Sequence, residues 1–177
     1  MRGPRSIPFL LPFAFTMACF TACARTVPDL EAERATIRQA IENSIGWALT
    51  KDTTVLFNSL AQDSAFFIYH PNAATTVVGW SEFLRAVPTW MDPAFKATRF
   101  EVKNLRINFS RSRTVAWYSA LLDDFAEWQG QPVGWENARW TGVLEKRDGR
   151  WLIVQMHFSF AIEQIQSEVQ EGSQRQD

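Results

Sequence analysis

Cysteine is almost absent from this chain of 177 residues, because its two cysteines, Cys19 and Cys23, both lie within residues 1–24. The part that follows can form no disulfide, so it depends on its hydrophobic core for stability. Histidine is equally scarce, with two residues. No set of His and Cys has the spacing of a metal site, and we expect no bound metal. A glycine-rich phosphate loop and a nucleophile elbow are also missing, and we expect no cofactor.

An excess of basic charge is missing too. The net charge is −1, with 18 Lys and Arg against 19 Asp and Glu. The chain therefore offers no positive field to a nucleic acid backbone, and we expect no nucleic acid partner. After residue 24 no hydrophobic stretch reaches membrane-spanning length. Hydrophobic residues still make up 46% of the chain and charged residues 21%, which is typical of a globular domain.

Residues 1–24 have the pattern of a secretory signal peptide. Two arginines, Arg2 and Arg5, precede a short apolar run broken by prolines, and the small residues FTACA follow. Residues 20–23 are similar to a bacterial lipobox, with Phe20 where Leu is usual, which would make Cys23 the lipidated first residue. Ordinary cleavage after Ala24 is the alternative. The position of both cysteines in this segment favours lipidation.

We therefore expect an exported, periplasmic protein that is held at the membrane by a lipid on Cys23. Residues 25–28 would form a tether, residues 29–163 the folded domain, and residues 164–177 a polar tail.

Helical periodicity marks the amino-terminal part of the domain. Apolar residues recur there at steps of three and four, which indicates amphipathic helices. Thr53 is placed to cap the second helix, and we expect the third, preceded by Gly79, to end before Pro88. The predicted helices cover residues 29–49, 54–61 and 80–87.

Strand patterns dominate the rest of the domain. Apolar and aromatic runs bounded by turn residues predict one early strand and then a meander of four long ones. The first long strand would be bulged near Lys103 and Asn104, where the alternation slips. The predicted strands cover residues 65–70, 100–109, 114–128, 133–146 and 150–161.

This order of elements predicts an α+β domain. Amino-terminal helices gathered at one end of a curved antiparallel sheet would close it into a cone, whose mouth is a natural site for a small ligand. The many Phe (14) and Trp (8) residues fit a thick core or a lined cavity. Trp90 and Phe95 are among the expected walls of either.

Several motifs carry a resemblance to a known family. They are LFNSLAQDSAFFIYHP with VVGWSEFL, Arg139-x-Thr141, the turn at residues 148–151, and Trp151-x-x-Val154-x-x-His157-x-Ser159. Over residues 30–163 the chain resembles the SnoaL-like branch of the nuclear transport factor 2-like (cystatin-like) superfamily. The last motif is also similar to the end of the association domain of calmodulin-dependent kinases. The resemblance implies the cone-shaped fold, but members include isomerases, dehydratases, cyclases, epoxide hydrolases and non-catalytic modules.

The last hairpin decides which side chains meet. A two-residue turn (148–149) would place Trp140 opposite His157, whereas a three-residue turn (147–149) would place Arg139 there. The three-residue turn separates apolar from mixed residues more cleanly, so we predict that register. The mixed face, with Arg139 and His157 as neighbours, would then line the pocket.

Four residues are candidates for catalysis. His157 is the candidate acid or base, because its ordinary pKa is near neutrality; the alternative is a core histidine satisfied by Ser159 or a carbonyl. Arg139 could hold an anion with its planar guanidinium, or pair with an acidic side chain. Asp123 and Asp124 point to opposite faces of a strand, so only one can enter the pocket. A solvated strand end is the alternative for both.

Further residues are candidate ligand contacts. The same alternation turns either Trp117 or Tyr118 inward. Tyr69 could donate a hydrogen bond to an oxyanion, whereas His70 before Pro71 is expected in a surface loop. The predicted ligand-binding residues are Tyr69, Trp80, Trp117, Tyr118, Thr141, Gln155 and Ser159.

Two functions are consistent with these patterns. The first is an exported domain that binds a small, largely apolar ligand, with any catalysis being cofactor-free acid–base chemistry of the isomerase, dehydratase or cyclase type. The second is a non-catalytic module whose open sheet face mediates dimerisation or partner binding. We expect a homodimer.

Overall fold

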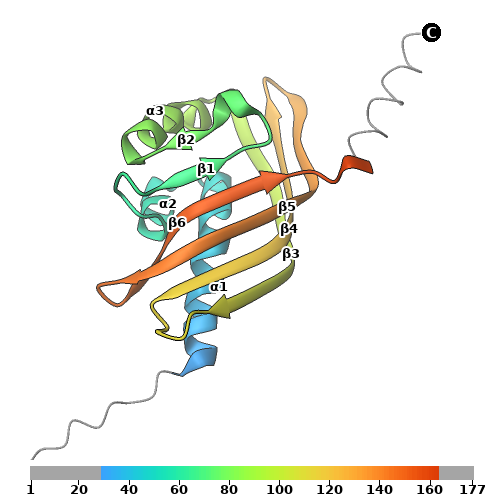
Figure 1. The fold of residues 1–177 in the computed structure, drawn as a ribbon. Helices are drawn as coiled ribbons and strands as arrows, with labels where there is room; N and C mark the ends of the chain where they lie inside the picture. Colours follow the sequence, from blue (N-terminus) through green and yellow to red (C-terminus); the bar gives the residue numbers. More distant parts are fainter. Residues whose placement is uncertain (1–28, 164–177) are drawn as a thin grey trace, which may run out of the picture.

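The structure, a computed structural model, describes residues 29–163 (Figure 1). The predicted signal peptide, its Cys23 and the polar tail lie outside these residues. Within the described part no helix is long and apolar enough to cross a membrane. The fold is α+β, as predicted: helices dominate the first part and four long strands follow.

Helix α1 (Leu30–Gly46) begins after Asp29, whose side chain accepts a hydrogen bond from the Glu31 backbone N–H at 3.0 Å. It continues directly into the short 3₁₀ helix η1 (Trp47–Leu49). One face of α1 packs on the sheet, and its buried residues are Ile37, Ala40, Ile41 and Ser44.

Helix α2 (Thr53–Ser59) is capped by Asp52, where we expected Thr53. The Asp52 carboxylate accepts hydrogen bonds from the backbone N–H groups of Thr54 (2.9 Å) and Val55 (3.2 Å). A charged acceptor at a helix amino terminus also interacts favourably with the helix dipole, which explains why it is the cap.

Helix α3 (Trp80–Met91) contains Pro88 and continues past it, so the predicted end before Pro88 is wrong. Proline fits a helical φ angle but removes one backbone donor. Buried Phe83 and Val87 hold this helix to the core, and the Pro88 carbonyl accepts from the Asp92 N–H at 3.0 Å. Tertiary packing therefore outweighs the missing hydrogen bond.

The sheet has six strands in the order β2-β1-β6-β5-β4-β3. Its long strands pair antiparallel as predicted, but β1 runs parallel to β6, so the sheet is mixed. The predicted bulge in β3 is confirmed by a register shift between Lys103 and Arg106. The strands are β1 (Phe67–Tyr69), β2 (Val77–Val78), β3 (Phe95–Phe109), β4 (Val115–Trp128), β5 (Gln131–Arg147) and β6 (Arg150–Ser159).

The turn between β5 and β6 has two residues, so the predicted three-residue turn is wrong. Asp148 (φ 50°) and Gly149 (φ 78°) both take positive φ angles, as a tight hairpin turn requires, and Arg147 lies opposite Arg150. A second irregularity follows, because the register shifts by one residue beyond Val143.

This bulge places Thr141 opposite His157 and Arg139 opposite Ser159. The sequence pattern could not reveal this bulge. A bulge shifts the strand register by one residue, and a turn one residue longer would have the same effect on the pairing beyond it. Arg139 and His157 are therefore not directly paired.

The helices cover one face of the sheet, which we call the inner face; the opposite face is the outer face (Figure 1). The inner face carries the core, including Tyr118, Trp140, Met156 and Phe158. The prediction that the mixed face lines the pocket is wrong. Helices bury the apolar face, because burial of unpaired polar side chains is unfavourable.

Candidate functional site

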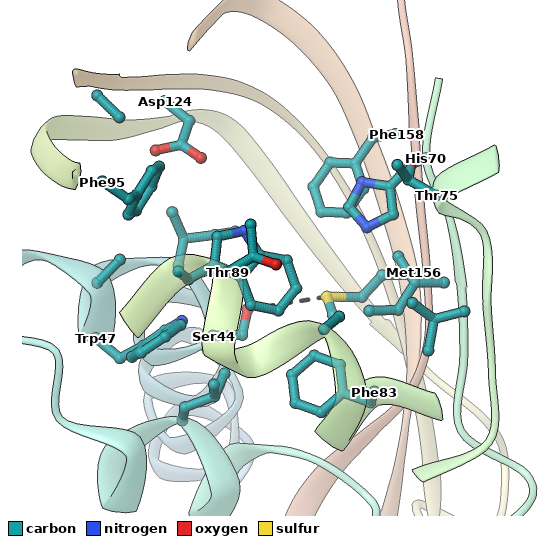
Figure 2. A pocket seen from close by; sticks show the side chains of 18 of the residues that line it. Ser44, Trp47, His70, Thr75, Phe83, Thr89, Phe95, Asp124, Met156 and Phe158 are labelled. Carbon is teal, nitrogen blue, oxygen red and sulfur yellow. Dashed lines mark hydrogen bonds between the residues drawn. The ribbon is translucent and has the colours of Figure 1, made fainter. Parts of the chain in front are cut away.

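A cavity of about 640 Å³ lies between the inner face of the sheet and helices α1 and α3 (Figure 2). Its size is that of a pocket for a small organic ligand. Most of its surface is apolar, and six aromatic side chains contribute to it: Trp47, Phe83, Trp90, Phe95, Trp135 and Phe158.

Aromatic contacts hold these walls in place. On the helix side, the ring of Trp90 meets that of Trp47 edge-on, with centroids 6.4 Å apart, and lies 5.9 Å from that of Phe83. On the sheet side, Trp135 and Phe158 have centroids 5.3 Å apart. Packed aromatic rings of this kind form a preorganised apolar surface.

Asp124 is an unusual member of this lining. It follows Leu122 and precedes Ala126 on the inner face of β4, and its carboxylate points into the cavity (Figure 2). Among residues 29–163 no group donates a hydrogen bond or forms an ion pair with it. Burial therefore acts unopposed and raises the pKa of Asp124 from 3.8 to about 6.

His70 lines the opposite wall, just after β1. Its ring stacks on Phe158 with centroids 5.4 Å apart and planes 20° from parallel. Burial lowers the pKa of His70 below the ordinary 6.5, so the imidazole is neutral at pH 7. A neutral imidazole has one nitrogen that accepts a proton and one that donates a hydrogen bond.

Asp124 and His70 face each other across the cavity and do not touch (Figure 2). A ligand between them would meet one ionisable group at each end. Burial raises the pKa of Asp124 to about 6 and lowers that of His70, so at pH 7 the cavity holds a carboxylate on one wall and a neutral imidazole on the other. The arrangement can therefore bind an apolar molecule and exchange protons with it.

Behind the sheet-side wall lie two buried polar groups, the Tyr118 hydroxyl and the Trp140 indole N–H. Neither has a hydrogen-bond partner within the described part of the chain. Trp140 stacks on Phe158 (5.6 Å, 14°) and meets Tyr118 edge-on (5.2 Å, 84°). Burial raises the pKa of Tyr118 far above 10, so its hydroxyl stays protonated.

Of the four predicted catalytic residues, Asp124 alone lines the cavity. The strand alternation is confirmed, because its neighbour Asp123 points to the outer face, where it pairs with Lys103 at 2.7 Å. His157 and Arg139 are exposed on the outer face. The structure therefore places Asp123, Arg139 and His157 on the outer face and leaves Asp124 without them in the cavity.

The predicted ligand contacts also lie away from the cavity. Tyr69 is 53% exposed and meets His157 edge-on across the outer face, at 6.0 Å. Trp117 is exposed and Tyr118 is inward but in the core. Trp80 packs against Phe57 in the core. Thr141, Gln155 and Ser159 belong to β5 and β6 and do not line the cavity.

His70 was expected in a surface loop; it does lie in the loop after β1, but it is half-buried and lines the cavity. A signal was present, because Phe66 and Ile68 are buried and His70 follows them at the same two-residue step. Trp90 and Phe95, expected as walls, do line the cavity. Among residues 29–163 no three His, Cys, Asp or Glu side chains cluster as a metal ion would require.

Comparison with known proteins identifies the family. The model of a SnoaL-like domain matches residues 37–163. The chain belongs to the SnoaL-like domain family. No curated protein matches it.

Solved structures with the same fold have varied roles. A candidate dehydratase of the NTF2-like family from Streptomyces avermitilis is 14% identical with a TM-score of 0.64, and 76% of this chain covers 99% of it. A hexachlorocyclohexane dehydrochlorinase (LinA type 2) is 18% identical with a TM-score of 0.60, and the match covers 73% of this chain and 86% of the dehydrochlorinase. The association domain of the C. elegans kinase CaMKII is 17% identical, TM-score 0.55, with coverage of 73% and 97%. With sequence identities of 14–18%, these similarities show that the SnoaL-like chain has the same fold as the three proteins.

Proposed function

We propose that this SnoaL-like domain binds a small, largely apolar ligand in the cavity and acts on it by cofactor-free acid–base chemistry. One observation carries the proposal: two ionisable side chains, Asp124 and His70, face an aromatic cavity from opposite walls without polar protein partners among the described residues. Buried polar groups are normally satisfied, and those that are not concentrate at functional sites.

His70 is suited to take a proton from the ligand, because its imidazole is neutral at pH 7. Its stacking on Phe158 fixes the plane of the ring. Asp124 meets the other end of the ligand. Proton removal of this kind starts isomerisations and eliminations. The dehydratase and dehydrochlorinase among the structural neighbours carry out eliminations by name, which supports the same reaction class here.

The two histidines of the chain provide a matched test. We expect mass spectrometry of the purified protein to detect a retained small molecule, and its turnover or retention to fall at least tenfold in His70→Ala. His157→Ala, altered on the exposed outer face, should behave as the unmodified protein does. A loss confined to His157→Ala would instead support the hypothesis that sequence alone suggested.

A second function is favoured by the outer face of the sheet. It exposes Tyr69 (53%), Trp117 (46%) and Val78 (60%), and exposed apolar patches mark interaction surfaces. We propose that this face forms a homodimer, which the likeness to an association domain supports. Sedimentation of Trp117→Arg tests it: the variant should be monomeric where the unmodified protein is dimeric, and an unchanged sedimentation coefficient would refute the interface.

Export remains a proposal that rests on residues 1–24. Their charge, apolar run and small residues support a signal peptide, with lipid on Cys23 as the membrane anchor of the periplasmic domain.

A further inference from the structure

Two neighbouring aspartates of β4 have opposite environments. Asp123, on the outer face, is held by the Lys103 ammonium at 2.7 Å and by the Asn137 backbone N–H at 2.8 Å. Asp124, on the inner face, has no comparable partner within residues 29–163. Asp124 is half-buried and faces an open cavity, so its carboxylate is left to water or to a ligand, and a ligand that paired with it would relieve its partial desolvation.

The other charged groups of the cavity do not neutralise Asp124. His70, on the opposite wall, is uncharged at neutral pH. Glu82 of α3 is also acidic and accepts a hydrogen bond from the Val78 N–H at 2.6 Å. Arg85 of α3 is exposed and donates to the Ser81 carbonyl of its own helix at 3.3 Å. At pH 7 the buried part of the cavity therefore carries a negative charge.

The walls near this charge are aromatic. Phe95 lies beside Asp124 in Figure 2, and Trp135, Trp47 and Trp90 line the same cavity. Aromatic faces attract cations, most strongly where water is excluded, whereas they offer little to a second anion. A carboxylate without a protein partner and the faces of aromatic rings together form a site for an organic cation.

We propose that the ligand of this cavity is an organic cation, an amine or quaternary ammonium on an apolar or aromatic body, with its positive nitrogen against Asp124. The inference rests on the proposed ligand site and specifies its chemistry. Asp124 anchors the ligand, and proton transfer is left to His70. A positive charge also makes neighbouring C–H groups more acidic, which suits a neutral base on the opposite wall.

Three probes of similar size test the charge preference: phenyltrimethylammonium, its uncharged isostere tert-butylbenzene, and benzoate. Binding is followed by tryptophan fluorescence, because Trp47, Trp90 and Trp135 line the cavity. At pH 7.5 we expect the cation to bind at least tenfold more tightly than tert-butylbenzene, and benzoate to bind most weakly. Near pH 5 about a tenth of Asp124 is ionised, since its pKa is about 6, so the cation should bind about tenfold more weakly there.

Two variants isolate the carboxylate. Asp124→Asn should bind the cation and its isostere equally within about twofold, and any pH dependence left in it reports His70. Glu127→Gln removes the same charge from an exposed site near the end of β4 and should keep the full preference. The inference is overturned if the unmodified protein binds the cation and its isostere equally, or if Asp124→Asn keeps the preference for the cation. Either result would still support the cavity as a ligand site. If none of the probes binds, the ligand site fails with it.

Discussion

Replacing Asp124 with Asn should stabilise the free protein, and the gain should depend on pH. The carboxylate lies in an aromatic cavity without a polar partner among the described residues, so its ionisation opposes folding. Asn has nearly the same shape and carries no charge. Residues that serve a binding site often lower the stability of the ligand-free protein.

The magnitude follows from the pKa of Asp124, which rises from 3.8 to about 6 on folding. At 1.36 kcal/mol per pKa unit, ionisation costs the folded state about 3 kcal/mol at pH 7.5. Because folding raises the pKa of this acid, the free energy of unfolding falls as the pH rises. The protonated form stabilises the fold fully below pH 3.8, and that stabilisation is lost as the pH rises through about 6. We therefore expect Asp124→Asn to gain about 3 kcal/mol at pH 7.5 and about 1 kcal/mol at pH 4.5.

Asp123→Asn is the matched control with the opposite sign. Burial alone would raise the pKa of Asp123, but the Asn137 N–H and the Lys103 ammonium outweigh it and lower the pKa below 3.8. Its ionised form stabilises the fold above that value, and the contribution is lost as the pH falls through the lowered pKa. Asp123→Asn should therefore be less stable than the unmodified protein at neutral pH, by a difference that shrinks in acid.

Urea unfolding followed by tryptophan fluorescence measures both variants across this pH range. If Asp124→Asn is no more stable than the unmodified protein at pH 7.5, or if its gain does not fall in acid, folding does not desolvate the Asp124 carboxylate. If both variants change stability with the same sign, the assignment of the two aspartates to opposite faces is refuted.

Three further predictions concern other parts of the chain. Tyr118→Phe removes a buried hydroxyl without a protein partner among the described residues and should raise the free energy of unfolding by about 1 kcal/mol, whereas a loss would show that the hydroxyl is satisfied. Gly142→Ala would place a Cβ 2.5 Å from the Gln155 carbonyl oxygen and 2.5 Å from the Tyr118 ring, so thermal unfolding should show a loss of about 2 kcal/mol; an unchanged melting temperature would contradict this packing. Cys23→Ser should abolish metabolic labelling with a lipid precursor, and undiminished labelling would disprove the anchor.

Local signals in the sequence predicted much of the fold. The three helices, the long strands and the slip in β3 are all marked by periodicity or by residues that cap and turn the chain. The mixed sheet is different, because the parallel pairing of β1 with β6 joins residues 67–69 to residues 155–157. No local pattern specifies a contact at that distance along the chain.

The candidate site depended on such distant contacts. Alternation correctly showed that only one of Asp123 and Asp124 could enter the cavity. The pairing of β5 with β6 contains a bulge that the binary pattern conceals, so Arg139 and His157 share the mixed face without being paired. That face lies away from the cavity because the helices cover the apolar one. His70 was missed because β1 is short, and its half-buried position depends on neighbours from β6 such as Phe158.

The most direct test of the cavity as the ligand site is proton NMR of the two histidine rings. The chain has two histidines, so their ring signals can be assigned from His70→Ala and His157→Ala spectra. On titration with phenyltrimethylammonium or tert-butylbenzene, we predict that the His70 signals shift and saturate while those of His157 stay in place. Saturable shifts of His157, with His70 unmoved, would contradict the assignment of the site to this cavity.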